Sequence, residues 1–162
     1  MTRLLHIALI AITLSLAACS SDSCYDNGSS LPLATFHIDG RQQAVTGLSI
    51  MGIGVPGDSL LADAKSISEC YLPLRATTSS TSYALWRTVT SEGQTTTVRD
   101  TLTLDYRAVP VFHSVECGAM YDFDITGFTH TINGIDSVIL LTTHITNSRT
   151  PAMRIYFSDL SQ

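Results

Sequence analysis

The side chains with the greatest chemical reactivity in this sequence are its four cysteines and five histidines. His113 and Cys117 stand four positions apart, and a histidine beside a cysteine can act as the base that activates a thiol nucleophile. A spacing of four brings side chains together on a helix, whereas residues 111–115 have the pattern of strand and turn. A cysteine held in a disulfide also cannot attack a substrate. We therefore predict that the protein is not an enzyme, and keep a small enzyme built on this Cys/His pair as an alternative.

Three aspartates form the second candidate site. Asp122 and Asp124 share one face of a predicted strand, and Asp136 is expected across a hairpin beside Thr131. Carboxylates that converge can bind calcium or, as a pair, cleave a glycosidic bond. A solvated strand face explains the same pattern, and the chain is short for a glycosidase with a substrate cleft. We predict no metal and no cofactor, and keep a calcium-binding module as an alternative.

The other histidines and the glycines supply no further site. No two histidines share a metal-ligand spacing with a cysteine, which argues against zinc. His130 is expected in the core, on the face of Phe128 and Ile132. The glycines between positions 47 and 57 lack the Lys-Ser/Thr ending and the following helix of a phosphate-binding loop.

The first nineteen residues have the features of an export and lipidation signal. Arg3 precedes an apolar run that is shorter than the roughly 20 residues of a membrane-spanning helix. The run ends in Leu16-Ala17-Ala18-Cys19, which resembles the lipobox of bacterial lipoproteins. The resemblance implies cleavage before Cys19 and acylation of its sulfur and its new amino group. We expect a signal peptide over 1–18, the lipidated Cys19 and a polar tether over 19–30, and a single domain over 31–162.

The expected location is the cell envelope. Several acyl chains on Cys19 would hold the protein on a membrane stably. Ser20, rather than Asp, follows the cysteine. By the sorting rule of such lipoproteins, this favours the outer membrane, and which face the protein occupies stays open.

Composition excludes one class of partner and indicates the fold class. Without Arg3, eight basic residues against fourteen acidic ones leave a net charge of −6, and Lys65 is the single lysine. Nucleic acid is therefore not an expected partner, because no basic stripe is present to meet phosphates. Abundant Ser, Thr, Val and Ile favour strands over helices. We predict an all-β fold, a single antiparallel β-sandwich of Ig-like or transthyretin-like type with seven or eight strands.

Hydrophobic alternation and turn residues place the predicted elements along the chain. Pro110 is expected to interrupt one strand, so that 111–115 becomes an edge segment or crosses to the other sheet. Residues 58–67 are the best helical candidate, over one or two turns. The predicted strands cover 33–38, 48–55, 69–74, 83–90, 95–107, 121–132, 135–146 and 153–158.

Two local features refine the later strands. Tyr121, Phe123 and Ile125 form one inward set, and a bulge near Gly127 would shift the inward set to Phe128, His130 and Ile132. Asn133-Gly134 predicts a type I′ hairpin turn. This turn would set Ile132 opposite Ile135, His130 opposite Ser137 and Phe128 opposite Ile139.

With these motifs, the chain resembles a family of small uncharacterised Gram-negative lipoproteins that is classed as a domain of unknown function. The motifs are the lipobox, an early cysteine at Cys24, the strand over 48–54, the segment from Asp100 to Tyr106, and Cys117-Gly118. The resemblance implies no activity. It draws attention to Cys24 and Cys117 as a pair, and Cys70 departs from the pattern.

The cysteine count bears on redox chemistry. In an oxidising compartment thiols tend to pair. Lipidation of Cys19 would leave three cysteines, so one is free or bonds another molecule. We predict the disulfide Cys24–Cys117, which would close a loop of roughly 93 residues and stabilise the fold by about 4 to 5 kcal/mol. Cys70 is interpreted as a small buried apolar side chain.

The predicted function is that of a lipid-anchored envelope protein, a structural or binding module without enzymatic activity. Its partners would be the membrane, through Cys19, and an envelope protein or a glycan bound through loops or an exposed sheet edge. Clustered exposed aromatic residues would favour a glycan. The candidates are Tyr25, Tyr71, Tyr83 and Trp86.

Overall fold

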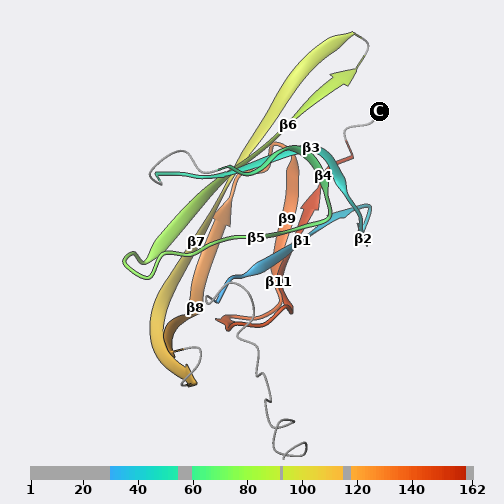
Figure 1. The fold of residues 1–162 in the computed structure, drawn as a ribbon. Coiled ribbons are helices and arrows are strands. Elements are labelled where there is room, and N and C mark those ends of the chain that lie inside the picture. The colour runs from blue at the N-terminus through green and yellow to red at the C-terminus, as the bar shows by residue number, and fades with distance from the viewer. Residues whose placement is uncertain (1–29, 55–59, 92, 115–117, 160–162) are drawn as a thin grey trace, which may run out of the picture.

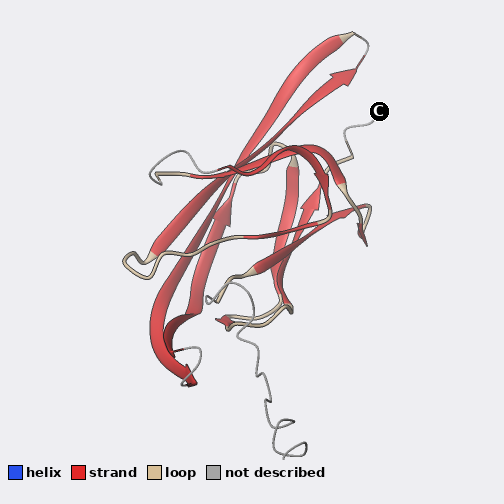
Figure 2. Cartoon of the chain, in the orientation of Figure 1, coloured by secondary structure: helices blue, strands red, loops and turns tan. Residues whose placement is uncertain are grey.

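The computed structural model describes residues 30–54, 60–91, 93–114 and 118–159. Within these ranges the chain forms eleven strands and no helix (Figure 2). None of the described residues therefore belongs to a helix long and apolar enough to cross a membrane. The strands are β1 (Leu33–Ile38), β2 (Arg41–Gln42), β3 (Val45–Gly52), β4 (Leu60–Ile67), β5 (Glu69–Tyr71), β6 (Ser80–Ser91), β7 (Gln94–Ser114), β8 (Gly118–His130), β9 (Ile135–Leu140), β10 (His144–Ile145) and β11 (Pro151–Phe157).

The smaller sheet joins the first and last strands of the domain. Its order is β2-β1-β11-β9, and β5 also pairs with β1, on the edge that β2 uses further along. β1 and β11 run parallel and side by side, as the blue and red strands in Figure 1 show. Parallel strands cannot be joined by a tight turn, and here almost the whole domain lies between them.

The larger sheet has the order β10-β8-β7-β6-β3-β4. β7 is its longest strand, and it contacts β6 and β8 over different parts of its length. β6 pairs with β7 from Gln94 to Asp105, whereas β8 pairs with it from Leu102 to Ser114. Each end of β7 therefore forms a two-stranded ribbon that extends beyond the other strands. One ribbon projects at the top of Figure 1 and the other curls away at the lower left.

The core lies between the two sheets. Its fully buried members come from strands of both, and Phe36 of β1 meets Phe157 edge to face at 5.7 Å. The largest buried side chains are Tyr83, Phe36, Leu48, Ile50, Leu72, Leu85, Leu102, Leu104, Ile135, Met153, Ile155 and Val45. The all-β prediction is thus confirmed, but the structure has eleven strands instead of seven or eight, and one pair is parallel.

The predicted helix over 58–67 is wrong. Residues 60–67 form β4, which pairs with β3 and places Ala62 opposite Ile50. Ala64 has a positive φ of 45°, and its backbone N–H donates to Ser49 Oγ at 2.9 Å. The helix propensity of the Leu-Ala-Asp-Ala-Lys stretch is overridden because pairing with β3 satisfies the backbone and buries Ala62.

The hairpin predicted at Asn133-Gly134 is also wrong. β8 and β9 belong to different sheets, and β9 pairs with β11. Neither Asn133 nor Gly134 has the positive φ that a type I′ turn requires. Phe128 lies opposite Leu104 instead of Ile139, and His130 lies opposite Leu102 instead of Ser137. Ile132 is therefore 76% exposed and not inward.

Other local predictions are confirmed or need correction in part. The turn at Asp39-Gly40 has two positive φ angles and joins β1 to β2. The bulge near Gly127 is confirmed, because Asp105 pairs with Gly127 while Tyr106 pairs with Ile125. β7 continues through Pro110, contrary to the predicted interruption. The edge character is right, since β7 pairs there with β8 alone.

Candidate functional site

The cysteines predicted to carry the lipid and the disulfide, Cys19, Cys24 and Cys117, lie outside the described residues. Cys70 lies in β5, is half-buried and is a free thiol that packs against the core. Its Sγ–H donates to the backbone oxygen of Tyr71 at 3.3 Å. Burial raises the pKa of the Cys70 thiol, because a thiolate there would lose its hydration.

The three candidate aspartates do not form one site. Asp122 and Asp124 lie on β8, whereas Asp136 lies on β9 in the other sheet and accepts a hydrogen bond from Ser158 Oγ at 2.5 Å. Among the described residues, no three His, Cys, Asp or Glu side chains are grouped so that they could hold a metal ion. Asp136 was misplaced because its expected position depended on the hairpin at Asn133-Gly134.

Asp124 instead lies at the centre of a row of charged side chains across three strands. It pairs in register with Arg107 of β7 on one side and His144 of β10 on the other. Arg107 Nη2 lies 2.7 Å from Asp124 Oδ2, and His144 Nδ1 lies 2.7 Å from Asp124 Oδ1. The hydrogen bond from Arg107, followed by that from His144, lowers the pKa of the Asp124 carboxyl. All three side chains are at least partly exposed, so the row attaches β10 to the sheet at a solvated surface.

Asp122 attaches the start of the domain to β8. Its side chain is buried, and Ser30 Oγ–H donates to Asp122 Oδ1 at 2.5 Å. Ser30 is the first described residue and is fully buried. The chain that precedes the domain therefore enters it beside the curled β7/β8 ribbon.

A groove of about 350 Å³ lies at the same place. Most of the side chains that line it are apolar, and Tyr121 contributes its one titratable side chain. No acid, base or thiol is present among the lining residues, so the groove has the chemistry of a contact surface. It is lined by Ser30, Leu31, Pro73, Leu74, Ala76, Ala119, Met120, Tyr121 and Phe123.

The outer end of the β7/β8 ribbon carries exposed apolar side chains that the sequence did not reveal. Phe112 is 70% exposed and Tyr121 is 46% exposed. Pro110 lies opposite Tyr121, and Phe112 lies opposite Ala119. Opposite residues share a face, so these four exposed residues lie together. We call Pro110, Phe112, Ala119 and Tyr121 the aromatic tip.

The aromatic tip continues the apolar face of the core. Closer to the core, the same face of the ribbon carries Tyr106 and Phe123, which are buried and meet edge to face at 5.4 Å. The ribbon extends past the smaller sheet, so the alternation that predicted Tyr121 inward is correct for the face and wrong for the burial. A signal in the sequence was the uninterrupted apolar run from Ala108 to Phe112, which contains no charged residue.

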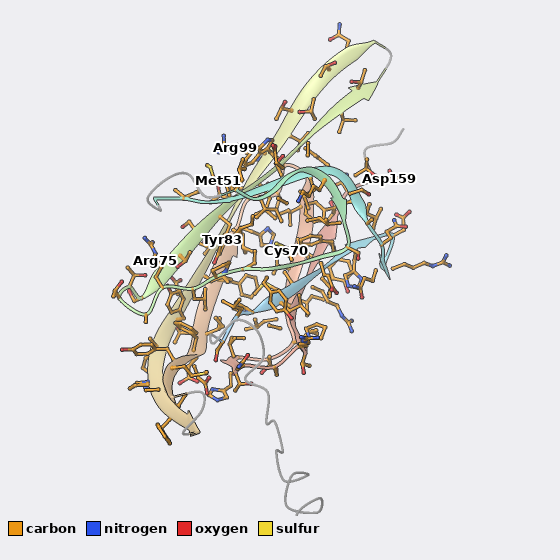
Figure 3. All side chains as sticks on the ribbon, in the orientation of Figure 1. Met51, Cys70, Arg75, Tyr83, Arg99 and Asp159 are labelled. Atoms are coloured by element: carbon orange, nitrogen blue, oxygen red, sulfur yellow. The ribbon has the colours of Figure 1, made fainter. Side chains whose placement is uncertain are left out.

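Among the aromatic residues proposed for glycan binding, none of the three that the structure describes is exposed, since Tyr71 and Trp86 are half-buried and Tyr83 is buried. Tyr83 is buried, and its hydroxyl donates to the backbone oxygen of Pro73. Burial raises the pKa of the Tyr83 phenol, and the neighbouring Tyr106 adds to this effect. Figure 3 shows Tyr83 and Cys70 near the middle of the molecule in this view. Trp86 is half-buried, with the Arg99 guanidinium 5.2 Å from its ring centre. Tyr25 lies outside the described residues.

His37 and His130 each pack against an aromatic ring and lie within hydrogen-bond distance of a neighbouring oxygen. His37 is buried beside Tyr156, with 5.0 Å between ring centres, and its Nε2 lies 3.1 Å from Thr35 Oγ1. Burial lowers the pKa of His37, and the positive charge of Arg154 adds to this effect. His130 is half-buried and stacks on Phe128, and its Nδ1 lies 2.9 Å from the backbone oxygen of Thr131. His113 is the last but one residue of β7, and its predicted partner Cys117 lies outside the described residues.

The segment from Asp100 to Tyr106 positions loops. The buried Asp100 carboxylate accepts hydrogen bonds from Thr131 Oγ and from the backbone N–H groups of Asn133, Gly134 and Ile135, at 2.6 to 3.0 Å. Tyr106 OH bonds both backbone groups of Arg75 at 3.0 Å. The two ends of this motif therefore hold the loops on either side of β7.

The opposite end of β7 forms a second exposed feature. The pairing of β3 with β6 ends at Arg87, and the pairing of β8 with β7 begins at Leu102. Among the described strands, only β6 and β7 therefore form the ribbon over 88–91 and 94–97, which we call the β6–β7 arm. Threonine hydroxyls pair across it, Thr88 with Thr97 and Thr90 with Thr95, each at 3.2 Å.

The comparison with curated proteins and the comparison with solved structures found no significant match. A family model for the DUF6452 family, described as a family of unknown function, matches residues 47–157. The match runs from β3 to the end of β11 and includes the motif from Asp100 to Tyr106. It begins after Cys19 and Cys24, so it carries no information on lipidation. The chain belongs to the DUF6452 family of unknown function.

Proposed function

We propose that the protein is a lipid-anchored envelope module without enzymatic activity, which binds a partner protein through the β6–β7 arm. The anchor would be the acylated Cys19, and the location the outer membrane. The domain would be a β-sandwich of the Ig-like or transthyretin-like type. The observation that supports binding is the arm itself, whose two strand edges are open.

The arm offers backbone groups for a further strand. Ser91 pairs with Gln94 around a two-residue turn, so this pair exchanges hydrogen bonds and alternate pairs do not. The non-bonded pairs are Thr90–Thr95 and Thr88–Thr97, whose short hydroxyl contacts fit the closer approach of such pairs. Their backbone N–H and C=O groups point outward from the ribbon.

The surface of the arm lacks the usual protection of an edge strand. Open edges of sheets are commonly blunted by charged side chains, proline or a bulge. No charged residue and no proline occurs over 88–91 and 94–98. The two segments pair with each other without a bulge. Such an edge suits strand addition by an extended segment of a partner, with backbone bonds supplying affinity. A glycan is less favoured as the partner because Tyr83 is buried and Trp86 is half-buried, so neither aromatic ring is fully exposed.

The arm can be tested by removing one outward N–H. Thr97→Pro removes the donor and leaves the β6–β7 ladder intact, whereas Thr97→Ala keeps the donor and removes the same side chain. A photo-crosslinker at Thr95 in living cells should yield an adduct with an envelope protein. We expect Thr97→Ala to retain the adduct and Thr97→Pro to reduce it roughly tenfold, the effect of about one backbone hydrogen bond. An adduct that is equally strong in both variants would contradict strand addition.

The anchor is tested separately. Cells labelled with a palmitate analogue should incorporate it into the protein, and Cys19→Ser should abolish the label. Cys70→Ser is the matched control and should leave the label unchanged. Label that persists in Cys19→Ser would show that the anchor is not at this residue.

A further inference from the structure

We propose that the aromatic tip docks onto the surface of the lipid bilayer, so that the domain is held against the membrane by a protein contact as well as by its acyl chains. The inference rests on the proposed anchor at Cys19. It names a surface, the residues Pro110, Phe112, Ala119 and Tyr121, and a partner, the interfacial region of the bilayer.

The aromatic tip lies close to Ser30, where the described domain begins. Ser30 is bonded to Asp122, the neighbour of the tip residue Tyr121. Ser30 and Leu31 line the same groove as Ala119 and Tyr121. Cys19 precedes Ser30 by eleven positions, so even a fully extended tether spans at most about 40 Å. The aromatic tip thus lies beside the end of the domain that the tether ties to the membrane.

The aromatic side chains of the tip suit the interfacial region of a bilayer. Phenylalanine and tyrosine with exposed rings are suited to the membrane interface, where an apolar ring enters the acyl region and a hydroxyl stays hydrated. Phe112 is 70% exposed on a two-stranded ribbon, where it has no packing role in the core. Over 108–121 the sequence has one charged residue, Glu116, which lies outside the described residues, and no Asp, Glu, Lys or Arg occurs in the described stretches 108–114 and 118–121. The carboxylate that follows, Asp122, is buried and bonded to Ser30.

The shape of the β7/β8 ribbon allows its end to contact a flat surface. The four residues share one face near the end of the β7/β8 ribbon, which extends beyond the other strands and curls at its end (Figure 1). A curled ribbon can touch a flat surface with this end while the rest of the domain stays in water. The opposite end of β7, with the β6–β7 arm, then points away from the bilayer and is free to reach a partner.

The test uses the processed, lipidated protein reconstituted into vesicles of phosphatidylethanolamine and phosphatidylglycerol. Phe112→Trp introduces an indole at the tip, and the native Trp86 serves as an internal reference. Trp86 pairs with Arg99, thirteen positions from Phe112 along β7, a strand path of roughly 40 Å. With brominated acyl chains we expect the indole at position 112 to lose most of its emission and to shift to the blue, while Trp86 keeps its emission.

A second measurement is transfer of the protein between vesicles. The double variant Phe112→Ser/Tyr121→Ser should transfer about tenfold faster, because two aromatic side chains no longer enter the bilayer. The matched control is Ile132→Ser/Ile139→Ser, which removes two exposed apolar side chains away from the tip and should leave the rate unchanged. Circular dichroism verifies that both variants are folded.

The outcomes separate the two proposals. If mass spectrometry shows acylated Cys19 but the indole at position 112 is not quenched, the docking is overturned and the anchor stands. If Cys19 carries no lipid, the anchor fails, and docking is then judged by quenching of the processed protein added to preformed vesicles. If the double variant instead dissociates a dimer in sedimentation, the tip contacts a second copy and membrane docking is overturned.

Discussion

Asp100 is a buried carboxylate whose hydrogen-bond donors all come from one loop. Three backbone N–H groups and the Thr131 hydroxyl converge on its two oxygens. Next to this site, the buried Arg87 donates to the backbone oxygen of Ser158 and lies 5.6 Å from the ring centre of Phe157. Burial lowers the pKa of Arg87, while the nearby carboxylates Asp159, Asp136 and Asp100 oppose this. This polar cluster joins the two sheets at the base of the β6–β7 arm.

Replacing Asp100 should therefore destabilise the whole domain. Asp100→Ala leaves three backbone N–H groups of the loop without an acceptor, and we expect the free energy of unfolding in urea to fall by about 3 kcal/mol. Asp105→Asn is the matched control, because Asp105 lies on the same strand with an exposed side chain, and its effect should stay within about 0.5 kcal/mol. Equal effects of the two changes would refute the role of Asp100.

At the scale of elements, the loop between β8 and β9 is packed against β7. Gly134 lies so close to Val98 that a Cβ at position 134 would come 2.8 Å from Val98 Cγ1. The glycine is required here by close approach and not by a turn with positive φ. A side chain at position 134 would therefore force Val98 to move where the connection crosses from one sheet to the other.

This packing predicts a rescue between two elements. Gly134→Ala should lower the free energy of unfolding by about 1 to 3 kcal/mol, because Val98 must move. Val98→Ala should remove most of this cost in the double variant, since it deletes the atom that clashes. Gly127→Ala is the matched control, with its nearest contact, Asp105 Oδ2, at 3.7 Å. A double variant whose losses simply add would show that the contact is not the cause.

At the scale of the whole molecule, β7 links the two surfaces that carry the proposals. β7 begins at Gln94 in the β6–β7 arm and ends twenty positions later at Ser114. Near this second end, Pro110 and Phe112 contribute to the aromatic tip. The smaller sheet closes the domain through the parallel pair β1–β11, which brings the two ends of the domain together. Ser30, the first described residue, lies beside the tip, so the proposed anchor and the arm would lie at opposite ends of the domain.

The same arrangement bears on the predicted disulfide. Ser30 is bonded to β8 at Asp122, and the described part of β8 begins at Gly118. The segments that contain Cys24 and Cys117 thus join the described domain at neighbouring points. We expect peptide mapping of the processed, unreduced protein to give a Cys24–Cys117 bridge, and Cys24→Ser/Cys117→Ser to lower stability by about 4 kcal/mol.

Cys70 supplies the control in that experiment. Because burial raises the pKa of its thiol, Cys70 should be alkylated slowly at neutral pH in the folded protein and rapidly in urea. A Cys117 thiol that is free and rapidly alkylated would contradict the disulfide and revive the pairing of Cys117 with His113.

Local pattern was sufficient where one face of a strand meets the core. The bounds of β1 were predicted correctly because its residues are mostly apolar and the turn dipeptide Asp39-Gly40 ends the strand. The bulge near Gly127 was predicted because it shifts the alternation by one residue. The exposure of Phe112 and Tyr121 could not be predicted, since alternation identifies a face but not where the opposing sheet ends.

The sequence by itself determined the fold class, because strand propensity and alternation depend on neighbours along the chain. It also placed most strands and the motif from Asp100 to Tyr106. The order of the strands was decided only in the tertiary structure. Asn133-Gly134 has the composition of a hairpin turn, yet Asp100, more than thirty positions away, binds its backbone and directs β9 to the other sheet. Such contacts between distant residues outweigh a local turn preference because they satisfy a buried charge and the backbone at once.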